Sequence, residues 1–387
     1  MFEKSVEELT ELGAQITTAE IAQQPELWRD TLNIYRENKE AIEAFLAEAR
    51  AMGEGRLSVV FTGAGTSDYV GDTCAPYLRH AGNTDLYDFK PIATTDIVSA
   101  PRDFLRAEDP TLVVSFARSG NSPESLAAVA VAKELVHNVK FLNITCAPEG
   151  KLAVESADDP NALTLLIPRA NDKGFAMTGS YSCMTLLSTL IFDTASDEQK
   201  AEWVETIAKM GEEVIARESE VADYLAGDFN RVTYLAPAPL AALLRRASLR
   251  FSSLLTAWLP LLTTLPWAIV TDPSPSSTIR RSSSCSSTTT PTPVSTTSTS
   301  STRSVATRSL STPSPFSRKV PPSMRVSPSP LRLRGTSRGL PCSAVRDVCP
   351  AISLLNSVRV GNTPDTPSPT GTVNRVVKGV TIHPFTA

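Results

Sequence analysis

The chain carries Leu112-Val-Val-Ser-Phe-Ala-Arg-Ser-Gly-Asn-Ser-Pro-Glu-Ser125, where an apolar run breaks into hydroxyl side chains around one glycine. Apolar residues resume at positions 126–133, so the pattern predicts a strand buried on both faces, a tight loop and a helix. Ser122-Pro-Glu-Ser125 suits the helix start, because it offers a hydroxyl cap, a proline for the first turn and an acid near the positive end of the dipole. The stretch predicts one βα unit of a parallel sheet.

The same loop has the chemistry of an anion site. Free N–H groups at a helix start, with Ser119, Asn121 and Ser122 beside them, can surround a phosphate without a metal, and Gly120 lets the backbone approach. An ordinary βα turn with a good cap has the same residues, because capping residues are common at helix starts. The loop alone leaves both interpretations open.

A second loop of similar chemistry is Gly63-Ala-Gly-Thr-Ser-Asp-Tyr-Val-Gly-Asp72, which follows a short apolar run. It does not form the dinucleotide fingerprint Gly-x-Gly-x-x-Gly, because position 68 is Asp68. Instead, Gly65, Thr66 and Ser67 place backbone and hydroxyl groups where a sugar or its phosphate could bind.

Apolar runs separated by helical segments predict one sheet. The expected strands are Ser58–Thr62, Leu112–Phe116, Phe141–Thr145 and Leu163–Ile167, with a further strand and loop over residues 87–96. Their alternation with helices predicts a three-layer α/β fold, in which helices cover both faces of a parallel sheet. Ligands of such sheets bind at the carboxyl ends of the strands, which is where both loops fall.

The N-terminal part is expected to form two amphipathic helices between Thr18 and Met52, because apolar residues recur there at helical spacing. Examples are Tyr35, Ile42, Phe45 and Leu46.

Composition limits the class of protein. The 387 residues could hold two domains, and a hydrophobic content of 41% is enough for real cores. A net charge of −4 argues against a nucleic-acid partner. Neither a signal peptide nor an apolar run of membrane-spanning length is present, so we expect a cytoplasmic protein without a membrane partner. The six cysteines lack metal-type spacing and are expected to be buried thiols.

Three motifs together resemble the sugar isomerase (SIS) family: Thr62-Gly-Ala-Gly-Thr-Ser67, Ser115-Phe-Ala-Arg-Ser-Gly-Asn-Ser-Pro-Glu-Ser125 and Gly174-Phe-Ala-Met-Thr178. Alone, the third motif is better explained as packing at a helix start. The resemblance is closest to tagatose-6-phosphate ketose/aldose isomerases, also described as galactosamine-6-phosphate deaminase/isomerases. It covers about residues 18–235 and resumes over residues 360–384.

The resemblance implies N-terminal helices over residues 1–44, a first flavodoxin-like SIS domain over 45–205, a second over 215–364 and a tail over 360–387. It implies a phosphorylated sugar or amino sugar as substrate, a homo-oligomer, and neither a metal nor an organic cofactor. The residues expected to contact the substrate or its phosphate are Gly65, Thr66, Ser67, Ser119, Gly120, Asn121, Ser122 and Thr178.

The middle of the chain departs from the family. After Leu235 the family has a Gly-Ser-Gly loop, a helix with a Glu base and an Arg-His-Gly-Pro box, and none of these is present. Between Pro237 and Ser357 the only acids are Asp272 and Asp347, among crowded Ser, Thr, Pro and Arg. A disordered linker could have this composition, but it would have to replace a whole domain and end where the resemblance resumes.

A slip of the reading frame accounts for more of these features. Read one base earlier, Ser282-Ser-Ser-Cys-Ser-Ser287 becomes an apolar run typical of a buried strand, if its serines are encoded by TCN. The same shift permits Glu in place of Arg246 and the family's His in place of Thr271, within an Arg-His-Gly-Pro box. We therefore predict that residues 236–353 are out of frame, and that the second sheet expected from the family is disrupted.

The implied reaction moves a proton between C1 and C2 of an opened sugar through an enediol, which needs a carboxylate and donors for the developing oxyanion. Deamination starts in the same way and then releases ammonia from C2. Lys378 resembles a C-terminal lysine of glucosamine-6-phosphate synthase isomerase domains that reaches the sugar, although an exposed tail lysine explains it equally well. A non-catalytic SIS module that senses a sugar phosphate is the rival function, but the N-terminal helices carry no basic recognition helix.

The chain as written is predicted to bind a sugar phosphate without converting it. Arg246 and Thr271 cannot shuttle the proton as a carboxylate does or serve as a ring-opening imidazole. Calorimetry with galactosamine 6-phosphate, beside a turnover assay on this chain and on a frame-corrected version, tests the prediction. Equal turnover by the two chains would contradict the assignment of the catalytic groups to the altered segment.

Overall fold

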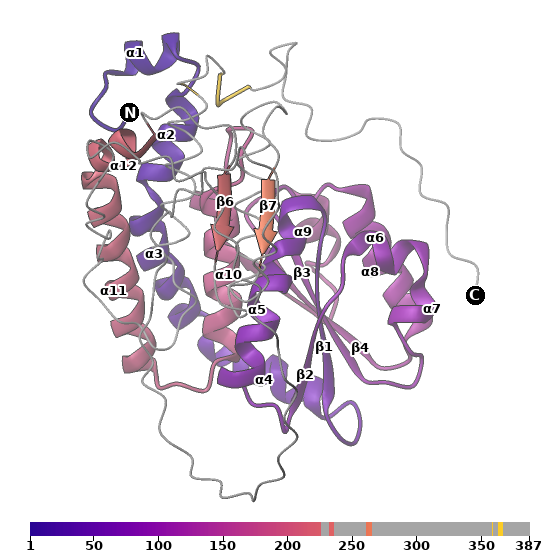
Figure 1. Cartoon of the computed structure of the whole chain (residues 1–387). Coiled ribbons are helices and arrows are strands. Elements are labelled where there is room, and N and C mark those ends of the chain that lie inside the picture. The colour runs from indigo at the N-terminus through magenta and orange to yellow at the C-terminus, as the bar shows by residue number, and fades with distance from the viewer. Residues whose placement is uncertain (226–231, 236–260, 265–357, 359–362, 367–387) are drawn as a thin grey trace, which may run out of the picture. The chain divides into compact units, whose positions relative to one another are not determined.

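The computed structural model describes residues 1–225, 232–235, 261–264, 358 and 363–366, and its centre is a five-stranded parallel sheet (Figure 1). The strands are β1 (Leu57–Gly63), β2 (Tyr87–Pro91), β3 (Thr111–Ala117), β4 (Val139–Thr145) and β5 (Ala162–Leu166). Their spatial order is β2-β1-β3-β4-β5, and every neighbouring pair is parallel. This is the flavodoxin-like order, so the predicted parallel α/β fold is confirmed.

The predicted strands are confirmed to within two residues at each end. Both β1 and β3 are buried along their whole length. A strand covered on both faces must be apolar on both, which is why these segments have near-continuous apolar runs.

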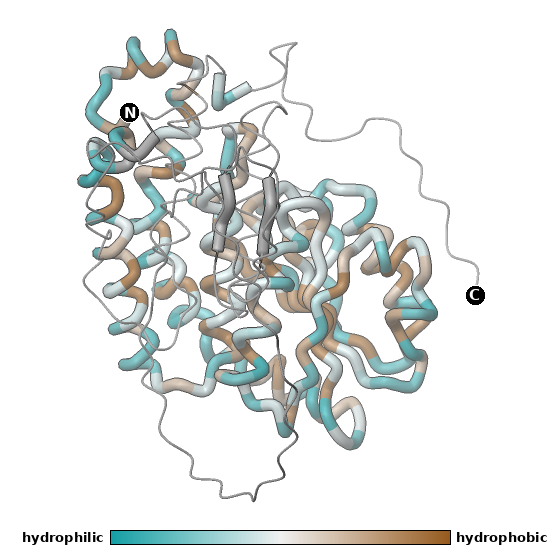
Figure 2. The backbone as a smooth tube through the Cα atoms, in the orientation of Figure 1, coloured by the Kyte–Doolittle hydropathy of each residue, from teal (hydrophilic) through white to brown (hydrophobic). Residues whose placement is uncertain are grey.

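Two helical layers cover the sheet. One face packs against α5 (Asp68–Ala81) and α10 (Gly179–Phe192), and these are backed by α3 (Gln24–Glu37), α4 (Lys39–Arg50) and α11 (Asp197–Ala216). The other face packs against α6 (Thr94–Ser99) and α8 (Pro123–Leu135), with α7 (Pro101–Phe104) and α9 (Lys151–Glu155) beside α8. Figure 2 shows hydrophobic and hydrophilic residues alternating along α3 and α11, as expected of helices with one buried side.

The two expected amphipathic helices are α3 and α4, and the apolar residues that predicted them, Tyr35, Ile42, Phe45 and Leu46, are buried. The structure divides the segment further, because α2 (Gln15–Ala22) ends before α3 begins at Gln24. Pro25 stands in the first turn of α3, where a proline favours a new helix start. Two short helices, α1 (Val6–Glu11) and α12 (Glu218–Leu225), complete the helices of the described ranges.

Trp28 fixes α3 on the sheet layer. Its side chain has no exposed surface, and its Nε1–H donates to Oγ of Ser182 in α10 at 2.9 Å. The outer side of α3 carries Arg29, which forms ion pairs with Glu205 and Glu212 of α11. Trp28 therefore joins the N-terminal helices to the core of the sheet domain.

The part of the chain predicted to be out of frame is described only at β7 (Leu261–Thr264), which pairs in parallel with β6 (Val232–Leu235). Arg246, Thr271, Lys378 and three cysteines, Cys285, Cys342 and Cys349, lie outside the described residues. The frame slip, the second domain and the domain boundaries thus stay predictions. Cys74, Cys146 and Cys183 are buried thiols that form no disulfide in the described part of the chain, as expected.

Within the described ranges, no helix is both long and apolar enough to cross a lipid bilayer.

Replacing Trp28 with alanine should lower the free energy of unfolding by about 3–5 kcal/mol, because the change leaves a cavity between α3 and α10. Urea denaturation followed by circular dichroism measures this loss. The matched control is Trp203→Ala, since Trp203 in α11 is only partly buried and should cost less. A loss below about 1 kcal/mol for Trp28→Ala would show that α3 is not fixed in this way.

Candidate functional site

The two loops predicted to bind a phosphorylated ligand begin side by side. Thr62 of β1 pairs with Ser115 of β3, and Gly63 pairs with Phe116, so both strands end at the same edge of the sheet. Neighbouring strands are about 4.8 Å apart. In this strand order the chain leaves β1 and β3 in opposite directions, and the crevice between their carboxyl ends is where open α/β sheets bind ligands.

The loop after β3 is held in shape by the start of α9. Gly120 has a φ of +65°, the left-handed conformation that glycine adopts without strain, and its carbonyl accepts from the N–H of Leu152 at 3.0 Å. The side-chain oxygen of Asn121 accepts from the N–H of Lys151 at 3.1 Å. Asn121 therefore ties the loop to α9, and its predicted contact with substrate stays a prediction.

The start of α8 has donor groups that form no hydrogen bond with any other described residue. Ser122 occupies the N-cap position before Pro123, as predicted, but its hydroxyl makes no capping hydrogen bond. The N–H of Ser125 donates instead to the backbone oxygen of Ser122 at 3.1 Å. In the part of the chain that the structure describes, the hydroxyls of Ser119 and Ser122 and the N–H groups of residues 120–122 have no hydrogen-bond partner. Groups of this kind at the positive end of a helix suit a phosphate.

The loop after β1 has matching chemistry. A 3₁₀ turn, η1 (Gly65–Ser67), runs directly into α5, which confirms the predicted Gly-rich loop and helix. Gly65 has a φ of +58°, Thr66 is half-buried and Ser67 is buried. Among the described residues, neither of the two hydroxyls finds a hydrogen-bond partner.

Asp68 brings a titratable group to this edge of the sheet. It is the first residue of α5 and directly follows Ser67. Burial raises the pKa of Asp68 to about 6, and the nearby carboxylates Asp72 and Asp96 add to the shift. The sequence identified Asp68 only as the residue that breaks a dinucleotide fingerprint, because burial is a property of the folded chain. Asp68 can therefore change its charge in the pH range where a sugar phosphate also titrates.

Arg118 is a cation within the motif Ser115–Ser125, and the sequence alone predicts no role for it. Its Nη1 donates to the backbone oxygen of Asp172 at 2.6 Å, which fixes one corner of a half-buried guanidinium. A guanidinium carries five N–H donors, so further donors remain beside the Ser119–Ser122 loop.

Thr178 is the N-cap of α10, and its hydrogen bonds go to Asp172. The carboxylate of Asp172 accepts from the hydroxyl of Thr178 at 2.8 Å, from its N–H at 2.9 Å, and from the N–H groups of Gly179 and Ser180 at 3.0 and 2.9 Å. Asp172 is 1% exposed, so the start of α10 is neutralised by a buried carboxylate of the protein itself. The substrate contact expected of Thr178 stays a prediction, and its hydroxyl hydrogen is already engaged.

A row of buried polar side chains lies along the same end of the sheet. Thr62, Ser115 and Asn143 stand side by side on β1, β3 and β4, and Thr145 ends β4. Within the described ranges each of the four has a side-chain oxygen that is buried and accepts or donates no hydrogen bond. Such an atom costs about 1–3 kcal/mol. Departures of this kind from the usual rules of stability are typical of functional sites.

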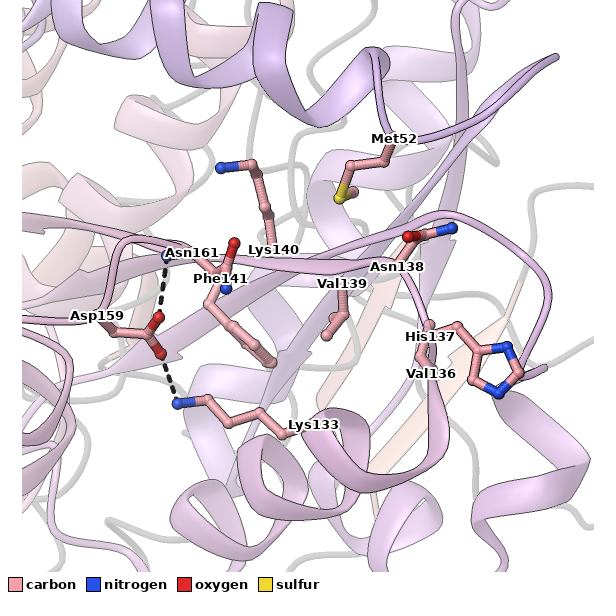
Figure 3. Close-up of a pocket in the computed structure, with 10 residues that line it drawn as sticks. All are labelled: Met52, Lys133, Val136, His137, Asn138, Val139, Lys140, Phe141, Asp159 and Asn161. Atoms are coloured by element: carbon pink, nitrogen blue, oxygen red, sulfur yellow. Dashed lines mark hydrogen bonds and ion pairs between the residues drawn. The ribbon is translucent and has the colours of Figure 1, made fainter.

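A hollow of about 400 Å³ lies elsewhere, at the amino ends of β4 and β5 (Figure 3). Its two lysines are already paired, Lys133 with Asp159 at 2.5 Å and Lys140 with Glu48 at 2.9 Å. His137 lines it as well and faces Glu108 at 3.4 Å. Because the hollow is at the opposite edge of the sheet and its cations are neutralised, we do not assign the ligand to it.

Metal chemistry would need a cluster of suitable side chains. Across the described ranges, no three His, Cys, Asp or Glu side chains come together in an arrangement that could hold a metal ion.

Comparison with known proteins adds the family. No protein-family model matches the chain. A candidate D-galactosamine-6-phosphate deaminase AgaS of Streptomyces coelicolor is 42% identical over 241 residues, which are 60% of this chain and 60% of that relative. The D-galactosamine-6-phosphate deaminase AgaS of Shewanella sp. is 33% identical over 389 residues, which are 98% of this chain and 95% of the relative.

Solved structures agree with these relatives. A candidate tagatose-6-phosphate ketose/aldose isomerase of Clostridium novyi superposes with a TM-score of 0.76 at 29% identity, over 100% of this chain and 99% of that one. The tagatose-6-phosphate ketose/aldose isomerase of Escherichia coli gives a TM-score of 0.58 at 31% identity, over 65% and 67% of the two chains. The chain belongs to the sugar isomerase family that contains the AgaS deaminases and the tagatose-6-phosphate ketose/aldose isomerases.

Proposed function

We propose that the described domain binds the phosphate of D-galactosamine 6-phosphate, and that the intact protein deaminates and isomerises this amino sugar. The observation that carries the proposal is the pair of loops at the ends of β1 and β3. Each loop offers, beside a helix start, hydroxyls that form no hydrogen bond with the described residues, and the two loops begin next to each other. The choice of amino sugar is supported by the near full-length relative, which is named as a D-galactosamine-6-phosphate deaminase.

In this proposal the phosphate rests on the start of α8. Ser119 and Ser122 donate their hydroxyl hydrogens to it, and the free N–H groups of residues 120–122 do the same. Arg118 adds positive charge beside the loop. Thr66 and Ser67 hold the sugar hydroxyls in this proposal; support comes from their loop, which begins beside the Ser119–Ser122 loop.

Proton transfer belongs to residues outside the described ranges. The enediol step needs a carboxylate near C1 and C2 and a group that opens the ring. The family resemblance puts these groups at positions 246 and 271, which hold Arg246 and Thr271. A second candidate function follows from these residues: as written, the chain is a sugar-phosphate-binding protein that does not turn over its ligand. The turnover assay on the frame-corrected chain distinguishes the two functions.

We also propose that the protein works in the cytoplasm. Support comes from Cys74, Cys146 and Cys183, which are buried and form no disulfide in the described part of the chain, the state that a reducing compartment maintains.

Changing Ser119 and Ser122 together to alanine should weaken binding of galactosamine 6-phosphate by at least about tenfold, because hydrogen bonds to a charged group contribute about 1.5–3 kcal/mol each. Isothermal titration calorimetry measures the dissociation constant. Ser99→Ala is the matched control, since Ser99 is exposed in α6 and donates only to the backbone of Asp96. Equal affinity of the double variant and the native chain would show that the phosphate does not bind at this loop.

Asp68→Asn should strengthen binding at pH 8 by about threefold and leave it nearly unchanged at pH 5. Above its pKa of about 6, Asp68 is charged and repels the phosphate, whereas below it the native side chain is neutral like asparagine. The ratio of native to variant affinity at each pH removes the effect of the phosphate's own titration, because that effect is the same for both proteins. Asp85→Asn, at an exposed position before β2, is the control. A ratio that does not change with pH would place Asp68 away from the bound anion.

The same substitution has a predicted effect on stability. The pKa of Asp68 is higher in the folded chain than its ordinary value of 3.8, so the folded state binds the extra proton between about pH 4 and pH 6. The native chain should therefore become more stable, relative to Asp68→Asn, as the pH falls through this window. Thermal melting of both proteins at pH 4.5 and pH 7.5 measures the difference, and parallel curves would contradict the prediction.

A further inference from the structure

The C-terminal segment Thr363–Thr366 packs against the start of α2. The carboxylate of Asp365 accepts hydrogen bonds from the N–H of Ile16 at 3.0 Å, and from the N–H and the hydroxyl of Thr17, both at 2.7 Å. The N-cap residue of α2 is Ala14, which has no side-chain group for this purpose. Asp365, 8% exposed, therefore supplies from the other end of the chain the cap that α2 lacks.

Close approach of this segment depends on Gly13. The N–H of Asp365 donates to the carbonyl of Gly13 at 2.8 Å. Gly13 has a φ of +57°, and a Cβ placed on it would lie 2.7 Å from Cβ of Thr363. Any other residue at this position would be strained and would push the segment away.

The same segment also reaches the loop that precedes α10. The carbonyl of Asp365 accepts from the N–H of Phe175 at 3.3 Å. Glu20 of α2 holds the residues just before it, because its carboxylate accepts from the N–H of Gly174 at 2.8 Å and from the N–H of Lys173. The backbone of residues 173–175 is thus fastened to α2 and to the C-terminal segment together.

The other end of this loop contacts Arg118, which directly precedes the Ser119–Ser122 loop. Asp172 caps α10 through its carboxylate, while its backbone oxygen accepts from Nη1 of Arg118 at 2.6 Å. The backbone of residues 172–175 therefore joins two hydrogen bonds, one from Phe175 to Asp365 and one from Arg118 to Asp172. Both hydrogen bonds join residues that are buried or half-buried, where such bonds are least weakened by water.

We propose that Asp365 is a positioning residue for the sugar-phosphate site. It fixes the loop of residues 172–175, and the loop fixes Arg118 so that the remaining donors of the guanidinium face an anion held by Ser119 and Ser122. This inference rests on the proposed function. It assigns to the C-terminal segment a part in ligand binding by the first domain, although Asp365 itself contacts no ligand.

The first test is the affinity for galactosamine 6-phosphate. Asp365→Ala should raise the dissociation constant by about fivefold. Asp365→Asn should have a smaller effect, since it keeps one acceptor oxygen for α2. Gly13→Ala disrupts the same contact from the side of α2, so it should raise the dissociation constant by about as much as Asp365→Ala. An unchanged dissociation constant for Asp365→Ala overturns the inference.

A control separates positioning from general loss of stability. Ser196→Ala removes the cap of α11, where Oγ of Ser196 accepts from the N–H of Gln199 at 3.3 Å, and it touches neither loop. Both Ser196→Ala and Asp365→Ala should lower the melting temperature, but only the second should weaken binding. If the two variants weaken binding equally, Asp365 acts through stability alone and the inference fails.

The route through Arg118 is tested by combining variants. Once Arg118→Gln has removed the guanidinium, adding Asp365→Ala should have little further effect on affinity. Fully additive effects would show that Asp365 does not act through Arg118.

Hydrogen exchange without ligand makes the test independent of the proposed function. Asp365→Ala should speed exchange at the N–H groups of Ile16, Thr17 and Phe175, and leave α11 unchanged. If the native chain binds no sugar phosphate, the proposed function fails, and so does the role of Asp365 in that site. Exchange at Phe175 then still decides whether Asp365 holds the loop. Unchanged exchange at Phe175 in the full chain overturns the inference, whatever the affinity.

Discussion

The pairing of β1 with β3 is the constraint on which the rest of the domain depends. It places two strands side by side although β2 lies between them in the sequence, and the strand order reverses at this point. The chain must then leave β1 toward one face and β3 toward the other, so the helices that follow them separate and leave a crevice. Burial on both faces requires apolar strands, and polar groups can gather only where the strands end. The strand order therefore determines where the two loops lie. Their place at the strand ends allows them to carry polar residues.

Two helix starts at this edge meet the same electrostatic demand in different ways. Each presents N–H groups without acceptors and a positive dipole end. At α10 the demand is met inside the protein, because Asp172 accepts four of its hydrogen bonds at ordinary distances and is almost fully buried. At α8 the hydroxyl of Ser122 makes no capping hydrogen bond, and the N–H groups of residues 120–122 donate to no other described residue. The difference is the reason for proposing an outside anion at α8 rather than at α10.

The features predicted correctly from the sequence are those set by local patterns. The buried runs in β1 and β3 and the helix start at Pro123 each depend on residues within a few positions of one another. Features that depend on distant residues were missed. Asp172 lies six residues before Thr178, outside the spacing of a capping motif, and Asp365 caps a helix from 348 positions away. The raised pKa of Asp68 could not be predicted from the sequence either, because the shift comes from burial in the folded chain.

The contacts of Asp365 also bear on the reading frame. Asp365 lies in the stretch where the family resemblance resumes, beyond the predicted slip. In the structure it meets three donors of α2, a glycine whose conformation leaves room for Thr363, and the backbone of a family motif at Phe175. A segment translated in the wrong frame would match these groups only by chance, because its residues were not selected for contact with them. The fit therefore supports a return to the native frame before position 363. Under this prediction the slip separates two tasks: the loops proposed to hold a phosphate lie before it, and positions 246 and 271, where the family resemblance puts the groups for proton transfer, lie within it.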